Sequence, residues 1–135
     1  MRYKKNKGRL VDLKHFLTAP IIDSMLVPLF FTDICCEIYH RLCFPVYNLP
    51  YIKRQNYIKI DRHRLSYLSG FDKMNCAYCG YANGLAGYWT KIAGETEKYW
   101  CGIKHNNSKG FVEPEHHKGF YEYGDDSKFR KRLCK

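Results

Sequence analysis

The chain has 135 residues, a length that fits one domain of ordinary size. Its 12 Tyr, 8 Phe and 2 Trp exclude low-complexity disorder over most of its length. Lys and Arg outnumber Asp and Glu by 23 to 13, and the formal charge of +10 predicts anionic partners, either phosphate backbones or acidic lipid head groups.

The cysteine content predicts a reducing environment. Seven cysteines are an odd number, which argues against a fully paired disulfide framework. The chain starts with basic and then apolar residues, but Asp23 interrupts the apolar part and no Ala-x-Ala-like cleavage site follows, so we expect no export signal. In a reducing compartment, clustered cysteines are typical of metal ligands.

The first predicted elements are a basic leader, residues 1–14, and an apolar segment, residues 15–47. The leader carries six basic residues and one acid. The apolar segment exceeds the roughly 20 apolar residues that span a bilayer. However, Asp23, Asp33 and Glu37 lie inside it, and a carboxylate in the bilayer centre costs several kcal/mol. A simple transmembrane span is therefore disfavoured.

Three interpretations of the apolar segment stay open. It is a helix or re-entrant hairpin in the membrane interface, a tilted single span, or a buried helical pair of a soluble protein. Residues 15–40 carry no Lys or Arg, whereas residues 41–75 carry seven basic residues and two acids. Basic charge on both flanks predicts that both ends lie at one anionic surface. We therefore expect residues 1–47 to be a membrane-associated helical region at the cytoplasmic face of a bacterial inner membrane.

Residues 48–135 are expected to form a small second domain. Apolar and polar residues alternate over residues 57–61, which predicts a strand. Residues 75–81 are expected to form a turn, and residues 83–99 a helix that ends at Cys101-Gly102. The helical face is formed by residues spaced four, three, four and three apart: Leu85, Trp89, Ile92, Thr96 and Tyr99. The fold class predicted for the chain is α+β.

A candidate metal site is defined by the spacing of Cys76, Cys79, Cys101 and His105. Two residues separate the first cysteine pair, and three separate Cys101 from His105. A Cys-x-x-Cys turn brings two sulfurs onto one ion, and positions i and i+4 of a helical turn point the same way. Three thiolates and one imidazole form a tetrahedral set that is common in structural zinc sites. We predict zinc, with iron as the alternative because both suit sulfur-rich tetrahedral sites.

Other assignments of these residues stay open. The fourth ligand can instead be His116, His117, Cys134 or water. The pair Cys76 and Cys79 can also be a redox dithiol, because Cys-x-x-Cys lowers the pKa of a thiol. A third alternative is that both cysteines are small core residues.

Two resemblances rest on short motifs. The stretch CAYCGY at residues 76–81 resembles the first knuckle of rubredoxins, C-x-x-C-G-Y, which implies iron, but residues 101–105 lack the second Cys-x-x-Cys-Gly of that family. Most of the chain resembles a family of small uncharacterised bacterial proteins, and this resemblance implies no activity. The motifs that carry it are CFP at 43–45, IDRH at 60–63, NCAYCGYANG at 75–84 and YWCGIKH at 99–105.

These features predict a membrane-associated accessory protein that is stabilised by a metal and binds a protein partner. Four protein ligands leave no open position for a substrate, so we expect a protein that is not an enzyme, and we identify no catalytic residue and no small-molecule substrate. One alternative is a soluble zinc-knuckle protein that binds nucleic acid through its basic and aromatic residues. The other is an iron-containing, rubredoxin-like redox protein.

Overall fold

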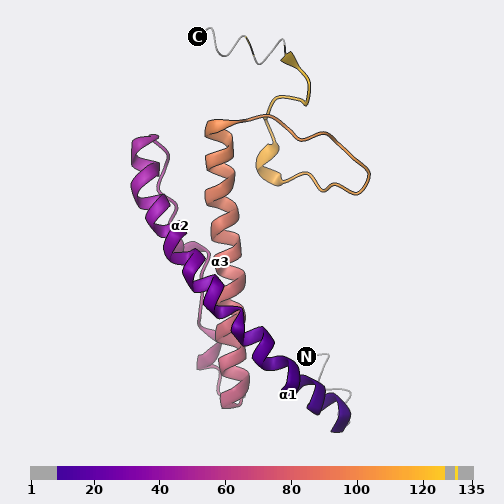
Figure 1. The fold of residues 1–135 in the computed structure, drawn as a ribbon. Helices are drawn as coiled ribbons and strands as arrows, with labels where there is room; N and C mark the ends of the chain where they lie inside the picture. The colour runs from indigo at the N-terminus through magenta and orange to yellow at the C-terminus, as the bar shows by residue number, and fades with distance from the viewer. Residues whose placement is uncertain (1–8, 127–129, 131–135) are drawn as a thin grey trace. The chain divides into compact units, whose positions relative to one another are not determined.

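A computed structural model describes residues 9–126 and 130 of the chain (Figure 1). The first eight residues of the predicted leader and Cys134, a candidate ligand, lie outside the described residues. The chain divides into two compact units, Met1–Ala86 and Gly87–Lys135. The predicted domain boundary after residue 47 falls inside the first of these units.

The apolar segment folds into two consecutive helices, α1 (Arg9–Ser24) and α2 (Leu26–Val46). They meet at Met25, whose N–H donates to the carbonyl oxygen of Ile22 at 3.1 Å. Pro28 lies in the first turn of α2, where the N–H that proline lacks has no partner within the helix. A helix can therefore restart directly after the break.

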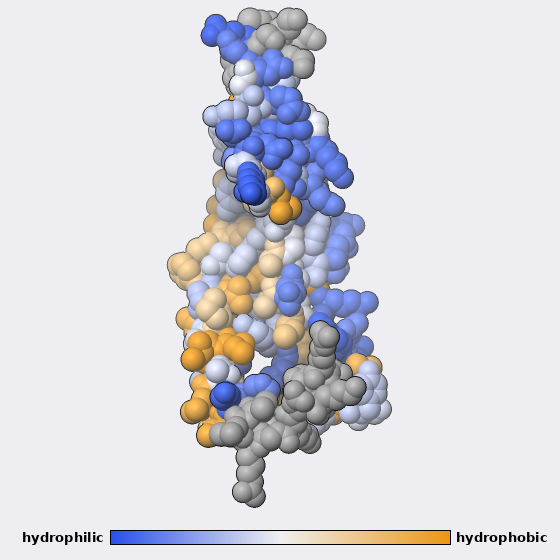
Figure 2. Space-filling model, turned by 90° about the vertical axis from the view of Figure 1, so that its right-hand side faces the viewer, coloured by the Kyte–Doolittle hydropathy of each residue, from blue (hydrophilic) through white to orange (hydrophobic). Residues whose placement is uncertain are grey.

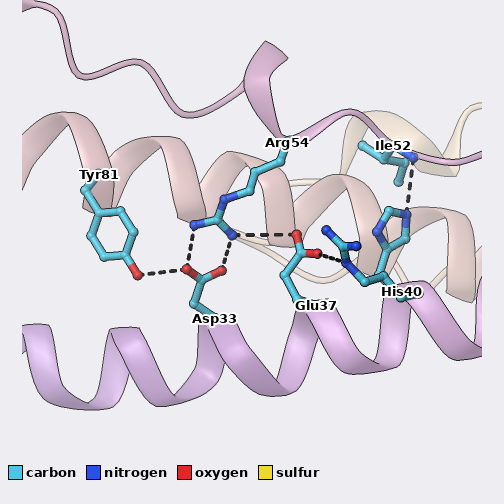
Figure 3. Close-up of polar contacts among 7 residues, drawn as sticks. Asp33, Glu37, His40, Ile52, Arg54 and Tyr81 are labelled. Carbon is cyan, nitrogen blue, oxygen red and sulfur yellow. Dashed lines mark hydrogen bonds and ion pairs between the residues drawn. The ribbon is translucent and has the colours of Figure 1, made fainter.

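The buried side of α2 contains an acid that is paired with a base (Figure 3). The guanidinium of Arg54 donates to both carboxylate oxygens of Asp33, with 2.6 Å between Nη2 and Oδ2. The hydroxyl of Tyr81 donates to Oδ2 of Asp33 at 2.9 Å, and Oε1 of Glu37 lies 3.6 Å from Nη1 of Arg54. These contacts connect α2 to the short 3-10 helix η2 (Arg54–Asn56) and to helix α3.

A second buried group on α2 is the imidazole of His40. Its Nε2 accepts the backbone N–H of Ile52 at 3.2 Å, and its ring packs edge-on against Phe44 and stacks on Tyr51, both at 4.5 Å between ring centroids. Burial lowers the pKa of His40. The ring is therefore neutral at physiological pH, as an Nε2 atom that accepts a hydrogen bond requires.

Helix α3 (Gly70–Trp100) begins at a side-chain cap. The hydroxyl of Ser69 accepts the N–H of Asp72 at 3.2 Å and donates to the carboxylate of Asp72 at 2.7 Å. Asp72 also places negative charge in the first turn, where the helix dipole favours it. This cap starts the helix well before the predicted residue 83, and the predicted turn at residues 75–81 is helical instead.

Two glycines of α3 let another backbone segment cross the helix closely. A Cβ atom at Gly80 would lie 2.9 Å from the carbonyl oxygen of Lys59. A Cβ atom at Gly84 would lie 2.7 Å from the carbonyl oxygen of Tyr57 and 2.8 Å from Cα of Ile58. Residues 57–59 therefore lie against α3 rather than in a sheet, and the 3-10 helix η3 (Arg62–Arg64) follows them.

The second unit continues from the end of α3, which falls at the predicted Cys101-Gly102. Gly102 has a φ of 63° and donates its N–H to the carbonyl oxygen of Glu97 at 3.0 Å, a helix end that favours glycine. An isolated parallel bridge pairs Ile103 with Tyr121. Between them lies the 3-10 helix η4 (Glu115–His117).

The structure contradicts the predicted α+β fold with an apolar membrane segment. The described residues are 65% helical with almost no strands, and they form no sheet. Residues 57–61 pair with no strand: residues 57–59 lie against α3, and Ile60 is exposed. Asp33 and Glu37, inside the apolar segment, face Arg54 of the same chain. Within residues 9–126 and 130, we find no helix that is both long and apolar enough to cross a membrane.

We predict that Gly84→Ala lowers the free energy of unfolding by about 2 kcal/mol, because the added methyl group overlaps two backbone atoms that cannot move independently. Urea denaturation measures the change. The matched control is Gly70→Ala on the same helix, where a Cβ atom meets no atom within 4 Å. Equal effects of the two substitutions would contradict the close crossing.

The Asp33 pair predicts an acid-dependent loss of stability. Burial raises the pKa of Asp33, but hydrogen bonds from Arg54 and Tyr81 and the charge of Arg54 outweigh it and hold the pKa below its ordinary value. The stabilisation is therefore complete above the unfolded pKa of about 3.9 and is lost as the pH falls through the folded pKa. Urea denaturation from pH 6 to pH 2 should show a smaller decline for Asp33→Asn than for the native chain. Identical declines would contradict this assignment.

Candidate metal centre

Three side chains of the second unit converge on one point. Glu97 lies in the last turn of α3, and His116 and His117 come from η4. Nε2 of His116 lies 2.7 Å from Oε2 of Glu97, and Nε2 of His117 lies 3.2 Å from Oε1. One ligand atom from each of the three residues lies within 4.8 Å of the other two. Each carboxylate oxygen thus faces one imidazole.

The tight turn of η4 lets adjacent histidines reach the same carboxylate. The N–H of His117 donates to the carbonyl oxygen of Pro114 at 3.0 Å, and the carbonyl oxygen of His117 accepts the N–H of Phe120 at 2.9 Å. The ring of His117 is fully buried and stacks on Phe120 at 4.9 Å between centroids. The ring of His116 meets that of His117 edge-on at 4.8 Å. Packing therefore fixes both ring planes.

Gly94 provides the room for His116 on the side of α3. A Cβ atom at Gly94 would lie 2.9 Å from Cγ and 3.1 Å from Nδ1 of His116. Gly94 precedes Glu97 by three residues, so both positions lie on one face of the helix. Because Gly94 has no side chain, the imidazole of His116 can approach α3 closely enough to reach the carboxylate of Glu97.

The electrostatics of the cluster keep the carboxylate charged. Burial raises the pKa of Glu97, but the hydrogen bond with His116 and the charges of His117 and His116 outweigh it, so the pKa lies below its ordinary value. The buried Nδ1 of His117 has no hydrogen-bond partner among the described residues. An ionised carboxylate beside two imidazole nitrogens is a donor set suited to a transition metal.

His105, one of the predicted ligands, lies at the edge of this cluster. Its Nε2 is 3.9 Å from Oε1 of Glu97, and its ring centroid is 5.4 Å from that of His117. The neighbouring Lys104 connects the loop that carries His105 to two other segments, with Nζ 2.8 Å from Oε1 of Glu122 and 3.3 Å from Oε1 of Glu113. The His105 side chain is 64% exposed.

The four predicted ligands are divided between the two units. Cys76 is buried and Cys79 is exposed, and both lie on α3 in the first unit. Cys101 is exposed just after α3, and with His105 it belongs to the second unit. A ligand set that joins the two units is not tested by this structure, and the Cys3His site stays a prediction. Within its unit, His105 lies beside Glu97 and His117, one of the alternative histidines.

Glu97 is the member of the cluster that sequence analysis missed. It lies between Thr96 and Tyr99 on a helix whose apolar face dominated the interpretation, and its partners are 19 and 20 residues away in the chain. The available signal was the pair His116-His117, which begins two residues after Pro114. A buried imidazole needs a hydrogen-bond partner, and a carboxylate in the last turn of a neighbouring helix can supply it.

No protein-family model, no curated protein and no solved structure matches the chain. The resemblances to rubredoxins and to a family of small bacterial proteins therefore stay predictions.

We predict that Gly94→Ala displaces the ring of His116 and weakens its hydrogen bond with Glu97, at a cost of about 1–2 kcal/mol because that bond involves an ionised acceptor. Histidine ring signals in two-dimensional NMR spectra should shift for His116 and His117, and the unfolding free energy should fall. Gly70→Ala, in open space at the start of the same helix, should leave the histidine signals unchanged. Unshifted signals in Gly94→Ala would contradict the contact.

Proposed function

We propose that this chain is a metal-binding accessory protein whose second unit holds one structural zinc ion through Glu97, His116 and His117, with His105 as the fourth ligand. The observation that carries the proposal is the convergence of a charged carboxylate and two imidazole nitrogens within 4.8 Å of one another. Zinc binds histidine nitrogen and carboxylate oxygen at about 2.0–2.2 Å in tetrahedral geometry. Glu97, His116 and His117 already lie around a common centre, and His105 would have to turn toward it to complete the tetrahedron.

The arrangement of the ligands favours a structural role. They come from three segments: the end of α3, the loop after it and η4. The described part of this unit buries few large apolar side chains, chiefly Tyr88, Ile92 and Phe120. A unit with such a small core gains much of its stability from a metal that crosslinks its segments. A structural metal in the second unit is therefore the part of the proposed role that this arrangement supports.

A second candidate follows from the exposure of His105. If water replaces this imidazole, two histidines and one carboxylate remain, and this facial arrangement is typical of non-haem iron(II) with open positions. The chain would then be an iron protein with redox chemistry. The two candidates share Glu97, His116 and His117 and differ in whether His105 contributes a ligand.

The test is metal binding by the full-length chain, with zinc content measured by elemental analysis and affinity by isothermal titration calorimetry. We expect one zinc ion per native chain. Glu97→Gln should reduce the affinity by at least about 100-fold, because it removes a charged ligand and preserves its shape. The matched control is Glu115→Gln, an exposed acid of η4 outside the cluster, which should bind as the native chain does.

A substitution in the predicted Cys3His set tests the alternative location of the metal. Cys76→Ser should retain the zinc ion if the cluster at Glu97 is the site. Loss of zinc in Cys76→Ser together with retention in Glu97→Gln would contradict the proposal and support the Cys3His set. His105→Ala then separates the two candidates, because it should weaken a four-coordinate zinc site but leave a three-residue iron site intact.

A further inference from the structure

One side of helix α2 exposes a continuous row of large apolar side chains. Val27, Phe31, Ile34, Ile38 and Leu42 follow one another at spacings of four, three, four and four, which places them on one face of a helix. Phe31 is 68% exposed and Leu42 is 66% exposed. We call these five residues the outer face of α2.

The outer face lies opposite the packed side of the same helix. Asp33, His40 and Phe44 are the buried residues of α2, and they also recur at helical spacing. Each residue turns the helix by about 100°, so the two sets are separated by roughly a third to half a turn. The outer face is therefore not the side with which α2 packs in its own unit.

Helix α1 of the same unit exposes further large apolar side chains, which lie on more than one side of that helix. Figure 2 shows hydrophobic residues reaching the surface in patches in the lower half of the view. Each exposed side chain presents on the order of 100 Å² of apolar surface. The five side chains of the outer face therefore present about 500 Å², which is the size of the largest patch on a typical monomer and a large part of the roughly 800 Å² per partner of a standard interface. The exposed members on α1 are Leu13, Phe16, Leu17, Ile21 and Ile22.

The charges around this surface favour a protein partner over an anionic membrane. Interfacial membrane helices carry Lys and Arg on their polar side. Residues 15–40 carry no Lys or Arg, and their three acids are Asp23, Asp33 and Glu37. Asp33 and Glu37 face Arg54 of the same unit, so their charges are paired within the chain and do not interact with a lipid head group. The cation that borders this face is Arg41, which lines one surface hollow with Ile34 and Ile38. Its charge is paired with Glu37 of the same helix at 2.9 Å, so the outer face offers little unpaired basic charge to an acidic lipid surface.

The same charges favour a second copy of this chain as the partner. The chain has a formal charge of +10, so two copies repel one another over most of their surfaces. Residues 15–40 form the stretch without positive side chains, and two copies can meet there with the least repulsion. The spacing of four, three and four on α2 is that of a helix-pairing seam. We propose that the outer face of α2, extended by α1, binds the same face of a second copy in a symmetric homodimer.

Sedimentation equilibrium of the full-length chain tests this proposal. At tens of micromolar the native chain should have twice the monomer mass of 16.1 kDa. The double variant Phe31→Glu, Ile38→Glu should raise the dimer dissociation constant by at least about 100-fold, because two central apolar contacts are replaced by like charges. Its helix content by circular dichroism should match that of the native chain, since both side chains are exposed.

The control is Val112→Glu, an equally apolar and 84% exposed position in the second unit, which should leave the dimer unchanged. Three results would overturn the proposal. A dimer that survives the double variant uses another surface, and a native chain that stays monomeric at 100 μM has no such interface. A monomer that binds vesicles containing a quarter phosphatidylglycerol, and loses this binding in the double variant, would assign the outer face to a membrane.

Discussion

A carboxylate that leaves water must be matched by positive charge or by a metal, and each unit of this chain is organised around one such group. In the first unit, Asp33 on α2 is matched by Arg54, which fixes the chain after α2, and by Tyr81 of α3. In the second unit, Glu97 at the end of α3 faces two imidazoles of η4. The first carboxylate has a permanent cation beside it. The second has groups that bind either a proton or a metal ion, and this difference is why the second unit is the place to expect a metal.

The parts of the fold that follow local rules were predictable from sequence. The helical face from Leu85 to Tyr99 and the helix end at Cys101-Gly102 are confirmed, since both depend on residues a few positions apart. The start of α3 was missed because the Cys-x-x-Cys spacing was interpreted as a turn. The cap formed by Ser69 and Asp72 was the local signal for the true start.

The predicted strand failed for a different reason. Alternating apolar and polar residues, as at 57–61, are compatible with any extended segment that packs on one side. The sequence alone does not show whether a sheet or a helix packs against that side. Here residues 57–59 cross α3 at Gly80 and Gly84, whereas Ile60 is exposed. These two glycines are four residues apart, so they form one smooth patch on the helix. Such a patch indicates a close backbone crossing, and its partner comes from a contact more than twenty residues away.

The histidines of the candidate site could be predicted from the sequence, but the carboxylate could not. His105, His116 and His117 were recognised as metal-ligand candidates, and the structure brings all three to Glu97. No residue near Glu97 in the sequence indicates its role, because its partner His116 lies 19 residues later in the chain. The cysteine spacing gave the stronger motif and therefore directed attention to Cys76 and Cys79. A motif describes local chemistry, whereas a ligand set is decided by tertiary contacts.

The most direct test of the central claim is X-ray absorption spectroscopy at the zinc edge on the zinc-loaded, full-length chain. The site at Glu97, His116 and His117 predicts a first shell of nitrogen and oxygen at about 2.0–2.1 Å, with the multiple-scattering pattern of imidazole rings and no sulfur. A first shell dominated by sulfur at about 2.3 Å would contradict the account and assign the metal to the cysteines.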